Sequence, residues 1–88
     1  MVEKEITVIN RSGLHTRPAA TVVKLASKFK SDVFLDRDGF SINAKSIIGV
    51  MTLAAEKGSK LILRTDGPDE QEAADSIEKL FTDGFGEN

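Results

Sequence analysis

Residues 13–20, which read Gly-Leu-His-Thr-Arg-Pro-Ala-Ala, contain side chains that could accept and hold a phosphoryl group. Pro18 fits the first turn of a helix, because the backbone N–H that it lacks would have no intrahelical partner there. His15 and Thr16 then fall at the N-cap, where free N–H groups and the positive end of the helix dipole favour an anion such as phosphate. We therefore predict that His15 is a phosphoryl acceptor and that Arg17 stabilises the phosphate through charge-assisted hydrogen bonds.

A simpler interpretation of His15 is a capping or surface residue without chemistry. Arg17 argues for another purpose, because a positive side chain in the first turn interacts unfavourably with the helix dipole. The positive helix end and Arg17 should both disfavour the imidazolium and leave the ring neutral, and therefore nucleophilic, near neutral pH. The sequence contains no nucleotide-binding loop and no paired acid cluster. We therefore expect a carrier that is not itself an enzyme and needs no cofactor.

The composition limits the class of protein. The 88 residues are enough for a single domain, residues 1–88, and 40% hydrophobic with 30% charged residues is typical of a soluble globular protein. A net charge of −2 argues against nucleic acid as a partner, and the chain has neither a membrane-spanning apolar run nor a signal-peptide pattern. We expect a cytoplasmic monomer. With one histidine and no cysteine, we expect no metal site and no disulfide.

The pattern of apolar, turn and capping residues predicts seven elements in the order β-α-β-β-α-β-α. The four strands are expected at residues 2–9, 32–37, 40–43 and 60–65. The three helices are expected from Thr16 to about Phe29, from Ile47 to about Leu53, and from the turn at Asp66-Gly67-Pro68 to Gly84. Residues 85–88 are expected to fray. This order predicts an α+β fold, an open-faced β-sandwich in which three helices cover one face of a four-stranded, mainly antiparallel sheet.

Two runs of the sequence together resemble a known family. Residues 13–20 and residues 44–51, which read Ala-Lys-Ser-Ile-Ile-Gly-Val-Met, are similar to the two motifs of the HPr family. These are the histidine-containing phosphocarrier proteins of the bacterial phosphoenolpyruvate-dependent sugar phosphotransferase system. The resemblance covers essentially the whole chain, and it implies the same open-faced sandwich with the outer strands in the middle of the sheet.

The resemblance also implies a function and partners. His15 would be phosphorylated at Nδ1, giving a pros-phosphohistidine. The donor would be enzyme I, itself phosphorylated from phosphoenolpyruvate, and the acceptors would be the enzyme IIA domains of sugar permeases. The partner enzymes would supply the catalysis, and Arg17 would stabilise the phosphate.

The short helix after Ser46 carries more large apolar residues than it can bury. One interpretation is that Ile47, Val50 and Leu53 all pack on the sheet. The alternative is that Ile48 and Met51 stay exposed as an apolar docking patch. The partner-binding residues implied by the resemblance are Thr16, Arg17, Ala20, Val23, Lys24, Ser27, Ile47, Ile48, Met51 and Thr52. The basic residues that would steer this surface toward acidic partners are Arg17, Lys24, Lys28 and Lys45.

Ser46 has an ordinary explanation as the N-cap of this helix. In some members of the family the matching serine is phosphorylated by an ATP-dependent HPr kinase. A phosphate at a helix N-terminus is tolerated by the fold, and here it would place negative charge beside the docking patch. We predict Ser46 as a regulatory site, with HPr kinase/phosphorylase and a catabolite-control transcription factor as further partners. Thr16 departs from many kinase-regulated members, which carry alanine at that position.

Three other functions are consistent with parts of the pattern. One is a signalling protein that acts through phospho-Ser46 on a transcription factor, although paralogues of that kind lack the histidine. Another is a carrier in a nitrogen-related phosphotransfer branch, with different partners. The third is a small RNA- or metabolite-binding module, which would need exposed aromatic residues on its strands or a basic stripe. Only Phe34 and Phe40 flank the hairpin predicted at Asp38-Gly39, and the net charge argues against nucleic acid.

Overall fold

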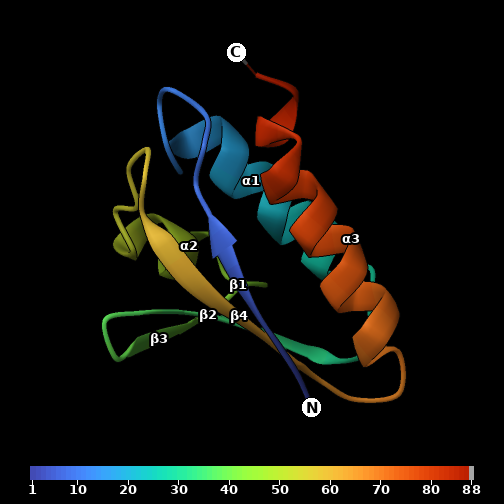
Figure 1. Cartoon of the computed structure of the whole chain (residues 1–88). Helices are drawn as coiled ribbons and strands as arrows, with labels where there is room; N and C mark the ends of the chain where they lie inside the picture. Colours follow the sequence, from blue (N-terminus) through green and yellow to red (C-terminus); the bar gives the residue numbers. More distant parts are fainter. Residues whose placement is uncertain (88) are drawn as a thin grey trace.

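The computed structural model describes residues 1–87. Its elements are β1 (Val2–Thr7), α1 (Thr16–Ala26), β2 (Asp32–Arg37), β3 (Phe40–Asn43), α2 (Ile47–Thr52), β4 (Lys60–Asp66), α3 (Glu70–Thr82) and a 3-10 helix, η1 (Gly84–Gly86). The three α-helices lie on one face of the sheet (Figure 1). The predicted α+β open-faced sandwich and its element order are confirmed.

The strands are arranged in the order β1-β4-β2-β3, and each neighbouring pair is antiparallel. The expectation that both outer strands lie in the middle is wrong for β1, because β4 and β2 take the inner positions and β1 forms an edge. Residues 3–5 of β1 are all charged, which suits an edge strand exposed to water. Leu63 and Leu35, which are paired across β4 and β2, are completely buried, as inner strands require.

The first helix is shorter than predicted. α1 ends at Ala26 because the backbone tightens there, and the amides of Lys28 and Phe29 donate to acceptors three residues back, at 3.1 and 3.2 Å, instead of four. The Nζ of Lys45 donates to the carbonyl of Phe29 at 2.9 Å and holds this turn against the chain before α2. Phe29 is therefore only half-buried, outside the stripe that α1 turns toward the core.

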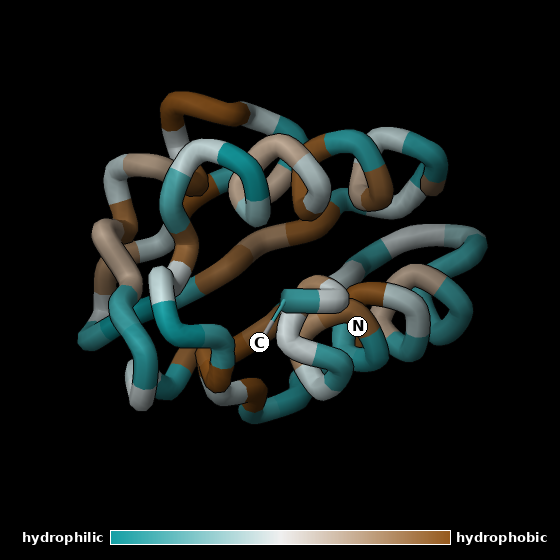
Figure 2. The backbone as a smooth tube through the Cα atoms, turned by 90° about the horizontal axis from the view of Figure 1, so that it is seen from above, coloured by the Kyte–Doolittle hydropathy of each residue, from teal (hydrophilic) through white to brown (hydrophobic). Residues whose placement is uncertain are grey.

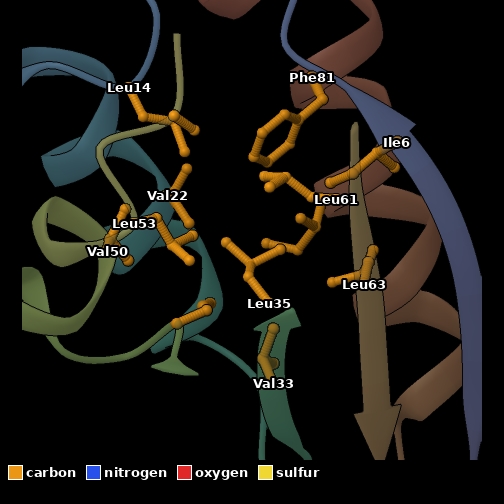
Figure 3. Packing of buried hydrophobic residues seen from close by; sticks show 14 of the residues in the cluster. Ile6, Leu14, Val22, Val33, Leu35, Val50, Leu53, Leu61, Leu63 and Phe81 are labelled. Carbon is orange, nitrogen blue, oxygen red and sulfur yellow. The ribbon is translucent and has the colours of Figure 1, made fainter. Parts of the chain in front are cut away.

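The core fills the space between the sheet and the helices. Hydrophobic segments run through the middle of the molecule, and most of the outer turns are hydrophilic (Figure 2). Leu14, Val22, Val50 and Leu53 point from the α1 and α2 side toward Leu35, Leu61 and Phe81 on the opposite side (Figure 3). All of these side chains are buried, so packing along its inner side holds α1 in place.

The chain after α3 is ordered by contacts with the core, so the predicted fraying is wrong for residues 85–87, while Asn88 lies outside the described residues. Gly84 and Gly86 have positive φ angles of 60° and 73°, and Phe85 between them also has a φ of 60°. This tight turn returns Phe85 to the molecule, where its ring packs edge-on against Phe81 with the centroids 4.8 Å apart. The two glycines allow this turn, because glycine adopts a positive φ angle without steric cost.

A buried serine ties the loop before β2 to the start of α3. The carboxylate of Asp69 accepts hydrogen bonds from the hydroxyl of Ser31 at 2.6 Å and from the amides of Lys30 and Ser31 at 3.0 and 2.9 Å. The Ser31 hydroxyl, followed by the Lys30 amide, lowers the pKa of Asp69 to about 2. The ionised carboxylate therefore stabilises the folded state.

This network makes stability depend on pH in a defined range. In the unfolded chain the pKa of Asp69 is about 3.9. The contribution of its carboxylate to the free energy of unfolding is therefore complete well above that pH and is lost as the pH falls toward about 2. We expect the free energy of unfolding of Asp69→Asn to be lower than that of wild type at pH 7, with the difference shrinking between pH 4 and 2. Chemical denaturation at several pH values would measure it, with the exposed Asp32→Asn as the matched control. A difference that stays constant down to pH 2 would contradict the assignment.

Candidate functional site

His15 is the N-cap of α1, as predicted. Its backbone is extended (φ −77°, ψ −172°), and its carbonyl accepts the first helical hydrogen bond from the amide of Ala19 at 2.9 Å. Thr16, Arg17 and Pro18 form the first turn, in which the amides of Thr16 and Arg17 have no intrahelical acceptor and Pro18 has no amide hydrogen. Thr16 is thus the first helical residue. The helix presents two backbone donors at its positive end, beside the imidazole.

The loop before His15 is fixed by a close backbone contact. Gly13 has a φ of 67°, and a side-chain carbon there would lie 2.5 Å from the carbonyl oxygen of Ala55. That same oxygen accepts a hydrogen bond from the amide of Leu14 at 2.8 Å, and the Leu14 side chain is buried. Asn10 closes the turn, since its Nδ2 donates to the carbonyl of Gly13 at 2.8 Å. His15 therefore follows directly after a segment with little freedom to move.

The imidazole of His15 is accessible and unused in capping. Its side chain is 43% exposed, and within residues 1–87 it makes no capping hydrogen bond at α1. Glu87 approaches it, with Oε2 at 3.6 Å from Nε2. Nε2 therefore faces a carboxylate.

Arg17 places its positive charge beside this position. Its side chain is exposed, and α1 has no acidic residue in its first turn to neutralise it. Arg17 also lines a pocket of about 160 Å³, and the other lining residues are Pro18, Thr21, Phe85, Gly86 and Glu87. A guanidinium and free backbone amides are the kinds of donor that suit phosphate oxygens.

Asn10 and Glu87 also belong to this site, although neither was predicted from the sequence. Asn10 stands in a turn cluster and Glu87 in a segment expected to fray, so neither carried a recognisable signal. Glu87 lies near His15 because α3 and η1 end at the same end of the molecule at which α1 begins (Figure 1). That arrangement depends on tertiary structure, which local pattern does not reveal.

The residues predicted to dock partners lie on the accessible sides of α1 and α2, two helices that pack against each other. Of the apolar residues on α2, Ile48 is 76% exposed, Met51 41% and Ile47 40%. The interpretation in which Ile47 packs on the sheet with Val50 and Leu53 is therefore wrong for Ile47, while the exposure of Ile48 and Met51 is as the alternative expected. The exposed polar and small members are Thr16, Arg17, Ala20, Lys24, Ser27 and Thr52, and Val23 is half-buried.

Ser46 is the N-cap of α2, as its position suggested. Its Oγ accepts a hydrogen bond from the amide of Gly49 at 3.2 Å, and the residue is exposed. Lys45 beside it is half-buried and bonded to the carbonyl of Phe29, so it is less free than Lys24 to steer a partner.

Across the described residues 1–87, no group of three or more histidine, cysteine, aspartate or glutamate side chains is arranged to hold a metal ion. In the same part of the chain, no helix has the length and apolar character needed to cross a membrane.

Comparison with known proteins agrees with this geometry. The family model described as "PTS HPr component phosphorylation site" matches residues 2–83. The chain is 52% identical to phosphocarrier protein HPr of Treponema pallidum, over 99% of each chain. It is 48% identical to the HPr-like protein Crh of Halalkalibacterium halodurans, over 88% of this chain and 92% of that protein. The crystal structure of HPr from Thermoanaerobacter tengcongensis superimposes with a TM-score of 0.97 at 42% identity, covering 100% of this chain and 99% of that one. The chain belongs to the HPr family of phosphocarrier proteins of the phosphotransferase system.

Proposed function

We propose that this protein carries a phosphoryl group on His15, between enzyme I and the enzyme IIA domains of sugar permeases. The observation that carries the proposal is the position of an accessible imidazole at the N-cap of α1, next to two amides without intrahelical acceptors. Family membership supports the carrier role, and the sites and partners are our inference.

The chemistry requires little of the protein itself. The lone pair of Nδ1 attacks the phosphorus of the donor, the P–N bond forms, and the bond between phosphorus and the donor's leaving atom breaks. The amides of Thr16 and Arg17 and the Arg17 guanidinium hold the negative oxygens. Because the P–N bond is labile, the phosphoryl group can pass on to an acceptor. We infer that the chain is the phosphorylated intermediate and not an enzyme, and that it works as a monomer in the cytoplasm.

The docking surface is proposed to consist of the exposed sides of α1 and α2. Exposed apolar residues of α2 adjoin basic residues of α1, a combination that suits an acidic partner with an apolar recess. Ser46 stands at the start of α2, so we propose that its phosphorylation adds negative charge at this surface and weakens binding to acidic partners.

The carrier role predicts a specific modification. After incubation with phosphoenolpyruvate and enzyme I, we expect an acid-labile phosphorus NMR signal in the phosphohistidine range, absent in His15→Ala. Arg17→Ala should still be labelled, but about tenfold or more slowly, because a hydrogen bond to a charged group contributes roughly 1.5–3 kcal/mol. Equal labelling of His15→Ala and wild type would refute the assignment.

The docking surface predicts unequal effects for two exposed isoleucines. Ile48→Ala should weaken binding to enzyme I by about tenfold, since burial of an isoleucine side chain contributes roughly 1.5–3 kcal/mol, part of which alanine retains. Ile62→Ala is the matched control, because Ile62 is 36% exposed on β4, on the face of the sheet away from the helices. Calorimetric titration would measure both affinities, and similar losses in the two variants would argue against the proposed surface.

Regulation at Ser46 predicts labelling by HPr kinase and ATP. Wild type and Ser12→Ala, which removes another exposed serine, should be phosphorylated, and Ser46→Ala should not. The product should bind enzyme I more weakly than the unmodified protein. If wild type accepts phosphate on Ser46 but never on His15, signalling through Ser46 would replace carriage as the leading function. Label on Ser46→Ala equal to that on wild type would overturn the site.

A further inference from the structure

Glu87 lies where a carboxylate can control the protonation of the His15 ring. We propose that Glu87 is a positioning residue for His15, which keeps the ring proton on Nε2 and thereby leaves Nδ1 as the free nucleophile. This inference deepens the proposed function and rests on it.

Both oxygens of the Glu87 carboxylate face groups of the site. Oε2 is 3.6 Å from Nε2 of His15, and Oε1 accepts a hydrogen bond from Nδ2 of Asn10 at 3.1 Å. Asn10 is only 2% exposed, and its Nδ2 also donates to the carbonyl of Gly13 at 2.8 Å. The carboxylate is therefore held between a buried amide and the imidazole.

The backbone delivers Glu87 to this place. η1 turns the chain after α3 back toward α1, and the ring of Phe85, packed on Phe81, anchors the turn. Arg17 lines the same pocket as Phe85 and Glu87. The pocket therefore carries both a carboxylate, which is suited to the ring proton, and a guanidinium, which is suited to the phosphate.

A neutral imidazole carries its single proton on one nitrogen or the other, and the neighbour that accepts this proton selects the tautomer. The negative charge of Glu87 near Nε2 favours the form with the proton there, although 3.6 Å is longer than a hydrogen bond. Contacts of this kind are often long in the free protein and shorten during reaction.

The same carboxylate fits the transfer step. When Nδ1 forms the P–N bond and the donor's bond to phosphorus breaks, the proton stays on Nε2 and the ring gains positive charge. Glu87 then faces an imidazolium, as the buried aspartate of a serine protease triad does. Passing the phosphoryl group on breaks the P–N bond, returns its electron pair to Nδ1 and restores the neutral ring.

A purely structural role for Glu87 would be to anchor the chain after α3 to Asn10. The two roles differ in what they change, since an anchor affects stability while a positioning residue also affects the tautomer ratio. The test must therefore observe the imidazole nitrogens directly.

The experiment is nitrogen-15 NMR of His15 at a pH at which the ring is neutral. Glu87→Ala should lower the ratio of the Nε2–H to the Nδ1–H tautomer by about two- to fivefold, because a partly exposed carboxylate interacts only weakly with the ring N–H. Glu87→Gln, whose amide oxygen can still accept the proton, should restore much of the ratio. Glu72→Ala, an exposed residue on α3 remote from His15, is the matched control and should behave as wild type.

The rate of phosphorylation by enzyme I is the second measurement, and Glu87→Ala should be slower than wild type and Glu72→Ala by a similar factor. An unchanged tautomer ratio or an unchanged rate in Glu87→Ala would overturn the inference. Failure of the proposed function is distinguishable, because then wild type itself would not be phosphorylated on His15, whatever its tautomer ratio.

Discussion

The contact of the loop at Gly13 with the carbonyl of Ala55 sets the position of almost everything at the site. Gly13 can approach that carbonyl only because it has no side chain and accepts a positive φ angle, and the next amide, of Leu14, completes the contact with a hydrogen bond. Leu14 then enters the core and α1 begins at the following residues. One backbone contact between distant parts of the chain therefore determines where the imidazole of His15 and the free amides of α1 stand.

Electrostatic groups of opposite sign meet the two sides of the histidine. The helix end and Arg17 attract an anion, while Glu87 faces Nε2. In the proposed transfer, the positive groups act on the phosphate and the carboxylate acts on the ring. The same surface continues into the exposed apolar residues of α2, so the proposed phosphorylation site and the proposed docking surface share one side of the molecule.

Local sequence patterns predicted the fold class and the position of His15 well. Pro18 marks the first turn of α1, and Ser46 does cap α2, because both residues act through short-range backbone geometry. Strand order and the arrangement of residues 85–87 were not predictable in this way. The position of β1 at the edge depends on pairing with β4, and the turn at Phe85 depends on a contact with Phe81 that glycine-rich sequence does not suggest. The pairing of Glu87 with His15 depends on the segment after α3 lying against the start of α1, which no local sequence pattern indicates.

The pairing of β1 with β4 also concerns how the protein folds. Val2 is paired with Thr65, so β1 can join the sheet only by pairing with a strand that lies nearly three quarters of the way along the chain. Closing such a large loop costs conformational entropy before the favourable free energy of strand pairing offsets it. Chains with many long-range pairings therefore fold more slowly than helical bundles of equal size. The Ala55 carbonyl precedes β4 and the Gly13 loop follows β1. The position of the N-terminal end of α1 therefore depends on the pairing of β1 with β4.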